Sequence, residues 1–298
     1  MDIEQAGWVH ANPGLATRLS RSMIIRTYFP QPPLSDFVEV FWLYEGFTQS
    51  AKERALPTGT VELVISLRDD RLQVFDRRNT CHDFRGAMIC GPHSEFFVID
   101  SAKDESVLGV HFKPGGAFPF LKLPLGELHN THVSLETLWG AKATELREQL
   151  LEAKTPEAKF RILERALLAQ AFHSLTRHPA VDFALKEFNR APLMRKISEM
   201  TDQIGLSQRR FIQVFRDEVG LTPKLFCRIQ RFQEVLRRIG NGKQFEWVDV
   251  ALACGYYDQA HFINDFQAFS GLNPTAYLAH PKDRNPNHVP ISSNQSSK

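Results

Sequence analysis

The chain has 298 residues, enough for two domains of common size that each bury a hydrophobic core. Apolar residues make up 43% of the sequence and charged residues 23%, which is typical of a globular protein and excludes a disordered chain. The sequence starts without a signal-peptide pattern and contains no run of about 18 apolar residues, so we expect a cytoplasmic protein without membrane contact.

The first part of the chain is predicted to be rich in β-strands. Residues 1–22 show no periodicity, and we expect them to form a flexible N-terminus. Short apolar runs separated by turn residues follow, among them VELVISL (61–67), RLQVF (71–75) and SVLGVHF (106–112). Runs of this kind predict a small β-sandwich or barrel.

Helical patterns begin at Ser134 and continue through most of the remaining chain. From there the apolar residues recur every three or four positions, and Thr155 followed by Pro156 is typical of a helix start. We therefore predict an α+β protein: a β-rich domain over residues 23–178 with helices at its C-terminal end, then an all-α domain over residues 179–281. Residues 282–298 are rich in Asn, Ser and Pro and are expected to form a disordered tail.

The predicted all-α domain contains an internal repeat. Six of its residues recur 51 positions later in the same order. Phe211, Phe215, Gly220, Leu221, Pro223 and Phe226 correspond to Phe262, Phe266, Gly271, Leu272, Pro274 and Tyr277. Ahead of each set, a helical stripe ending in Gly205 recurs 50 positions later and ends in Gly255.

Each copy of the repeat predicts a helix-turn-helix unit. Gly205 and Gly255 stand where a left-handed residue ends a helix, and Ser207 and Asp258 can cap the next one. The second helices, at about 207–219 and 258–269, bury their phenylalanines and leave polar faces outward. A helix from Pro223 to Ile239 would hold the two units at a fixed separation.

The outward faces of the second helices supply the candidate DNA-binding residues. In the first unit these are Arg209, Arg210, Gln213 and Arg216, and in the second Gln259, Ala260, His261 and Asn264. Arg can bind guanine and Gln or Asn can bind adenine through two hydrogen bonds each, in the major groove. By contrast, the aromatic stripes of both helices are expected to be core.

Positive charge is concentrated in the first unit and the connecting helix. The formal net charge of the whole chain is only +2, but residues 207–243 hold nine basic residues and three acidic ones, a net charge of +6. A charge run alone is most often a solvated helix face. Next to a helix-turn-helix pattern it predicts salt-dependent attraction to phosphates.

The repeat resembles the DNA-binding domain of the AraC/XylS family of bacterial transcription regulators. The most specific stretch is VALACGYYDQAHFINDFQAFSGLNPTAYL (250–278), and GLSQRRFIQVFRDEVGLTPKLF (205–226) is similar to the first unit. The resemblance implies two recognition helices in successive major grooves. It also implies base contacts by five residues, with Ile212 nearby: Arg209, Gln213, Gln259, Ala260 and Asn264.

Two departures from the family pattern concern the second unit. Asn264 stands where the family often has Arg, and Asp265 with Gln267 makes the second helix less basic. These differences predict that the second unit binds DNA more weakly, or reads bases with little support from phosphate contacts.

The resemblance also implies the partners of the protein. They are double-stranded DNA and RNA polymerase, with a small-molecule effector, a second copy of the chain, or both for the N-terminal domain. That domain is similar to the leading domain of some relatives in LPTGTVELVISL (56–67) and GVHFKPGG (109–116). The regulator could activate or repress transcription, and no cofactor is expected.

An enzymatic or metal-binding N-terminal domain, with DNA binding secondary, is the alternative. His129 and His132 have a spacing that could hold a metal, and His93 and His111 lie in the same domain, but we expect isolated polar histidines. An aromatic cluster could line a ligand pocket or form strand core: Phe41, Trp42 and Tyr44. The four cysteines are dispersed and predict free thiols, mostly buried: Cys81, Cys90, Cys227 and Cys254.

Overall fold

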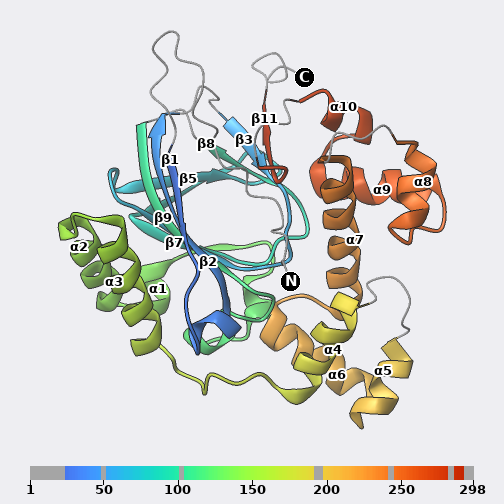
Figure 1. The fold of residues 1–298 in the computed structure, drawn as a ribbon, viewed down its shortest axis with the longest axis horizontal. Helices are drawn as coiled ribbons and strands as arrows, with labels where there is room; N and C mark the ends of the chain where they lie inside the picture. Colours follow the sequence, from blue (N-terminus) through green and yellow to red (C-terminus); the bar gives the residue numbers. More distant parts are fainter. Residues whose placement is uncertain are drawn as a thin grey trace, which may run out of the picture.

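The computed structural model describes residues 24–47, 52–100, 104–190, 197–240, 245–280 and 285–291. The architecture is α+β, as predicted, with an N-terminal antiparallel β-sheet domain followed by helices. In Figure 1 the strands occupy the centre, three helices lie on one side of them, and the C-terminal helices lie on the other side. The predicted flexible segment 1–22 lies outside the described residues.

The first sheet is antiparallel throughout and has six strands in the described residues. Their spatial order is β1 (Ile24–Tyr28), β2 (Val38–Phe47), β9 (Asp104–Phe112), β4 (Glu62–Ser66), β7 (Ala87–Cys90) and β10 (His132–Ser134). Because side chains alternate along a strand, the fully buried Leu63 and Ile65 share one face of β4, and Val64 lies on the other. Both faces of this sheet are therefore covered.

The second sheet packs against the far face of the first. Its described strands lie in the order β11 (His288–Pro290), β3 (Lys52–Ala55), β8 (Phe97–Asp100), β5 (Arg71–Phe75) and β6 (Cys81–Arg85). Val74, Met88 and Cys90 are buried between the two sheets. This arrangement agrees with the predicted sandwich-like or barrel-like domain.

The strand β11 differs from the prediction that residues 282–298 are disordered. Residues 288–290 pair antiparallel with β3, and Val289 is only 2% exposed. Pro290 is tolerated because β11 is an edge strand in the described sheet, where one row of N–H groups is not needed for pairing. A single buried valine in a segment rich in Asn and Pro gives too short a pattern for a sequence to indicate a strand.

Three helices cover the other face of the first sheet: α1 (Leu135–Trp139), α2 (Ala141–Glu152) and α3 (Pro156–Ala169). Ser134 Oγ accepts a hydrogen bond from the backbone N–H of Glu136, and Thr155 Oγ1 accepts one from Ala158. These contacts confirm the expected cap at Thr155. Three short 3-10 turns complete the domain: η1 (Leu34–Asp36), η2 (Phe118–Phe120) and η3 (Leu125–Leu128).

The C-terminal helices follow the predicted repeat. They are α4 (Pro179–Arg190), α5 (Ile197–Ile204), α6 (Gln208–Val219), α7 (Pro223–Gly240), α8 (Trp247–Ala253), α9 (Gln259–Ser270) and α10 (Pro274–Leu278). Aromatic rings from α6, α7 and α9 form one shared core, in which Phe215 packs on Phe226 and Phe266 packs on Phe232. None of the helices in the described residues is long and apolar enough to cross a membrane.

An ion pair joins α7 to α9 beside this core. The Asp265 carboxylate is buried and lies 2.6 Å from Arg228 Nη2, and Arg228 Nε also donates to it. This hydrogen bond raises the pKa of Arg228. The sequence suggested that Asp265 lowers the positive charge of the DNA-facing surface, but the structure places its carboxylate inside the helical domain.

The replacement Asp265→Asn should lower the free energy of unfolding by about 2 kcal/mol, because it removes a charge-assisted hydrogen bond and leaves the Arg228 guanidinium without its anion. Urea denaturation followed by circular dichroism would measure the loss. Asp202→Asn is the matched control, since Asp202 is exposed on α5. Equal stability of the two variants would show that the ion pair contributes nothing net.

Candidate nucleic-acid interface

The two helix-turn-helix units, α5–α6 and α8–α9, have the same local geometry. Gly205 and Gly255 make the turns with φ of +70° and +74°, conformations that glycine adopts without strain. Gly220 and Gly271 end the second helices with φ of +88° and +68°. The repeat seen in the sequence is therefore repeated in the backbone.

Side-chain caps fix where each second helix begins. Ser207 Oγ accepts a hydrogen bond of 3.3 Å from the backbone N–H of Arg210, and Asp258 Oδ1 accepts one of 2.7 Å from His261. Each cap satisfies one of the amides that a helix start leaves unpaired. The caps therefore fix the first residue of each helix, and burial of the phenylalanines then determines which side chains point away from the core.

On α6 the predicted polar face is outward. Phe211 and Phe215 are fully buried, whereas the four candidates are all exposed: Arg209, Arg210, Gln213 and Arg216. Gln213 Nε2 donates a hydrogen bond of 2.7 Å to Asp217 Oδ1. Asp217 thus orients the Gln213 amide on the exposed face.

Arg216 lies apart from the other α6 candidates, next to the β-rich domain. A Cβ atom placed on Gly126 of η3 would come within 2.9 Å of Arg216 Cγ. The pKa of His129, in the turn after η3, is lowered by burial and by the positive charge of Arg216. Arg216 therefore stands at the junction of the two halves of the chain.

On α9 three of the four candidates are exposed: Gln259, Ala260 and Asn264. The fourth, His261, is half-buried and packs edge-on against Tyr256 with ring centroids 5.3 Å apart. Tyr257, directly before the α9 cap, is 87% exposed and was not among the predicted site residues. An aromatic residue beside an N-cap is the sequence signal that would have indicated it.

Carboxylates neutralise part of the positive charge of α7. Glu234 accepts hydrogen bonds from both Arg237 and Arg238, at 2.6 and 2.7 Å, and these bonds lower the pKa of Glu234. Together with the Arg228 pair, three of the basic residues in segment 207–243 have acidic partners. In the described residues four exposed basic side chains of this segment form no ion pair: Arg209, Arg210, Arg216 and Lys224. The positive charge available to phosphates therefore lies on α6 and at the start of α7.

The four histidines considered as an alternative metal-binding site make hydrogen bonds within the β-rich domain or are at least partly buried there. His129 Nε2 is hydrogen-bonded to Ser94, and His111 Nδ1 is 2.7 Å from Glu62 Oε1. Burial lowers the pKa of His93 to about 4 and that of His132 to about 2. Across the described ranges, no three His, Cys, Asp or Glu side chains group closely enough to hold a metal ion.

The three aromatic residues considered as a pocket lining lie on both faces of β2. Phe41 is fully buried among the residues that pack under α1–α3. Trp42 lies on the opposite face, where a Cβ on Gly109 would come within 2.1 Å of its indole ring. Phe41 is therefore core, and Trp42 fills the space that Gly109 leaves.

Of the cysteines, Cys90 and Cys254 are buried, Cys227 is half-buried and Cys81 is exposed, all as free thiols.

Two family profiles match the chain. A domain of unknown function, DUF6597, matches residues 26–134, and a helix-turn-helix domain matches residues 200–280. The chain is 25% identical over 170 residues to a probable transcriptional regulator, LumQ, of Photobacterium leiognathi, covering 53% of this chain and 67% of LumQ. It is 27% identical over 81 residues to an HTH-type transcriptional regulator of Haemophilus influenzae, covering 27% of each.

Solved structures that the chain matches include ToxT from Vibrio cholerae and the AraC-like transcriptional activator CuxR. The ToxT match has 11% identity and a TM-score of 0.43, covering 87% of this chain and 98% of ToxT. The CuxR match has 12% identity and a TM-score of 0.25, covering 72% of this chain and 94% of CuxR.

The family profiles coincide with the two halves of the fold, and the named relatives are regulators of transcription. Residues 26–134 form a DUF6597 domain, and residues 200–280 form a C-terminal helix-turn-helix domain of the AraC type.

Proposed function

We propose that this protein is a sequence-specific transcription regulator in which α6 and α9 read successive major grooves on one face of duplex DNA. The observation that carries the proposal is the pairing of two capped helices, each with an exposed polar face. Both pack on α7, which has 18 residues. At a rise of about 1.5 Å per residue α7 spans roughly 27 Å, comparable with the roughly 34 Å between successive major grooves.

The exposed side chains divide by chemistry into base readers and phosphate contacts. Arg209 and Gln213 on α6, and Gln259 with Asn264 on α9, can each form paired hydrogen bonds with a base edge. Ala260 is small enough to allow close approach, or to contact a thymine methyl group. The remaining candidates are assigned to contacts with the phosphate backbone of the DNA: Arg210, Arg216 and His261.

The two units should contribute unequally to affinity. Arg209 and Arg210, which form no ion pair with the part of the chain that the structure describes, lie at the start of α6, whereas the exposed candidates on α9 are uncharged. Counterion release by basic residues supplies the sequence-independent part of binding. The first unit accordingly supplies most of the salt-dependent affinity, and the second unit mainly adds base preference.

The β-rich domain would bind a small effector, join a second copy of the chain, or do both, and the DNA-bound protein would contact RNA polymerase. The inner surface between the sheets carries a polar pair, Glu62 and His111, with Thr60 hydrogen-bonded to His111 at 3.2 Å. Although burial alone would lower the pKa of His111, its hydrogen bond to Glu62 raises it. A charged hydrogen-bonding group between two sheets suits recognition of a polar small molecule better than simple packing.

Selection of bound duplexes from a random pool, at a fixed salt concentration, tests the proposal directly. We expect two conserved sequence blocks separated by about one helical turn. Enrichment of no sequence would contradict the assignment to sequence-specific DNA binding.

The replacement Arg209→Ala should weaken binding to the selected site by about 1–3 kcal/mol and relax the preference at one base pair, since a paired contact to one base is lost. Fluorescence anisotropy with the selected site and with each single-base variant would measure both effects. Arg165→Ala, an exposed arginine on α3, is the control. An equal loss on every duplex would instead identify Arg209 as a phosphate contact.

The replacement Gln259→Ala should change base preference in the second sequence block, about 34 Å along the duplex from the block that α6 reads. Repeating the selection with this variant would locate the change, and Gln149→Ala on the surface of α2 provides a control of the same chemistry. An unchanged second block would mean that α9 supports α6 without reading bases.

A further inference from the structure

The loop between β7 and β8, residues 91–96, touches the C-terminal ends of both recognition helices. A Cβ atom placed on Gly220, which ends α6, would lie 2.4 Å from Cγ of Pro92. One placed on Gly271, which ends α9, would lie 2.3 Å from Cε1 of Phe96. Both glycine backbones therefore lie so close to this loop that a side chain at either position would force the loop or the helix end to shift.

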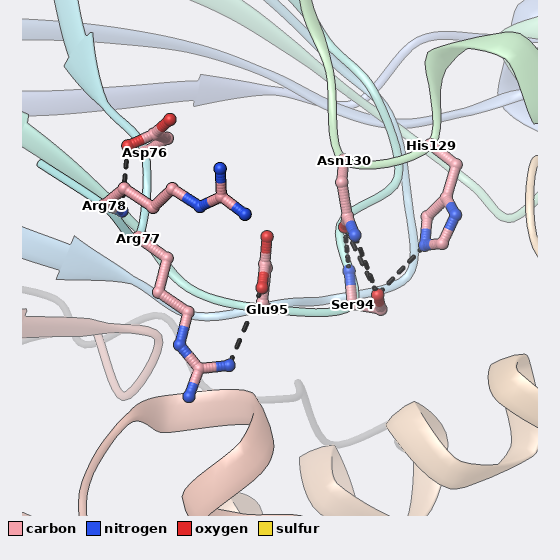
Figure 2. A network of polar contacts seen from close by, with 7 residues as sticks. All are labelled: Asp76, Arg77, Arg78, Ser94, Glu95, His129 and Asn130. Atoms are coloured by element: carbon pink, nitrogen blue, oxygen red, sulfur yellow. Dashed lines mark hydrogen bonds and ion pairs between the residues drawn. The ribbon is translucent and has the colours of Figure 1, made fainter. Parts of the chain in front are cut away.

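The loop is anchored to the β-rich domain at its centre (Figure 2). The backbone N–H of Ser94 donates to Asn130 Oδ1 at 2.7 Å, and Ser94 Oγ is 2.9 Å from His129 Nε2. Glu95 is 3.7 Å from Arg77, which lies in the turn between β5 and β6. Two separate turns of the β-rich domain therefore hold the loop between Pro92 and Phe96.

Phe96 is the apolar end of this anchor. Its ring packs against the hydrophobic core of the C-terminal helices. On its other side the guanidinium of Arg54, in β3, lies 5.1 Å from the ring centroid. The ring therefore contacts the β-rich domain through this cation–π interaction and the C-terminal helices through apolar packing.

Packing on the connecting helix α7 constrains the relative rotation of the two units less than an additional contact at the end of each recognition helix does. Each unit packs on α7 mainly through aromatic rings, Phe215 on Phe226 in one and Phe266 on Phe232 in the other. The α9 unit is also held to α7 by the ion pair between Arg228 and Asp265, whereas no ion pair joins α6 to α7 in the described residues. Apolar packing is not directional, so α6 has more freedom than α9 to rotate about α7. A third body that touches the end of each recognition helix removes this freedom.

We propose that Phe96, on the loop that Pro92 begins, is a positioning residue that fixes the separation and relative rotation of the two recognition helices. The β-rich domain would thereby set which spacing between the two DNA sequence blocks the protein accepts. This inference rests on the proposed DNA-reading function and adds a determinant of spacing to it.

The test measures binding of the full-length protein to duplexes that carry both selected blocks with spacers changed by one or two base pairs. Wild type should prefer one spacing. Phe96→Ala should reduce the ratio of affinities between the best and the altered spacers by at least about fivefold, the low end of typical coupling between sites. Base preference within each block should stay the same, because no base-facing side chain changes.

Phe75→Ala is the matched control, since Phe75 is a half-buried ring of β5 that packs under Lys52. A second variant, Arg77→Ala, removes the anchor of Glu95 with a side chain that is 50% exposed, so folding should be retained. It should broaden the spacing preference in the same direction as Phe96→Ala.

Three outcomes separate the inference from the function on which it rests. A broadened spacing preference in both loop variants, with the control unchanged, supports the positioning role. A spacing preference in the loop variants as sharp as in wild type overturns it and leaves the DNA-reading function intact. Failure of wild type to select two blocks overturns the proposed function itself.

Discussion

Aromatic packing along α7 is the constraint on which the C-terminal half depends. Phe226 and Phe232 are fully buried, and each receives a ring from a different helix-turn-helix unit. Since a helix has 3.6 residues per turn, burying Phe211 and Phe215 leaves Arg209 and Gln213 on the open side of α6. The same geometry places Gln259 outward on α9 once Phe262 and Phe266 are buried.

Ion pairs then determine which of the basic side chains on this helical framework keep their positive charge available. The Asp265 carboxylate forms a buried ion pair with Arg228, and Glu234 forms ion pairs with two further arginines of α7. These pairs are worth little to stability where they are exposed, but they remove positive charge from the connector. The positive charge that can attract a phosphate backbone therefore lies on α6 and at the start of α7, and is reduced along the rest of α7.

Much of this architecture could be predicted from the sequence because its signals are local. The caps at Ser207, Asp258 and Thr155 each depend on a side chain that accepts a hydrogen bond from the amide three residues further along the chain. The glycine turns depend on backbone conformations that few other residues adopt. The 50- or 51-residue repeat made both signals visible twice.

The rest depends on contacts between distant parts of the chain, and no local pattern encodes them. The inward orientation of the Asp265 side chain depends on its hydrogen bond with Arg228. The position of Arg216 depends on the close approach of Gly126, and the position of Phe96 depends on the close approach of Gly271. Strand β11 forms because β3 offers a free row of hydrogen-bonding groups, which a sequence does not display.

Strand β11 also changes how the two halves of the chain are connected. The chain leaves the β-rich domain before α4, forms the helical domain, and returns to pair with β3 (Figure 1). The helical domain is therefore topologically an insertion in the second sheet and is tethered at both ends. A shortened chain ending after α10 would leave β3 as an uncovered edge, and unpaired edges invite pairing with other molecules. The few residues after α10 thus cover the edge of β3 in the opposite domain.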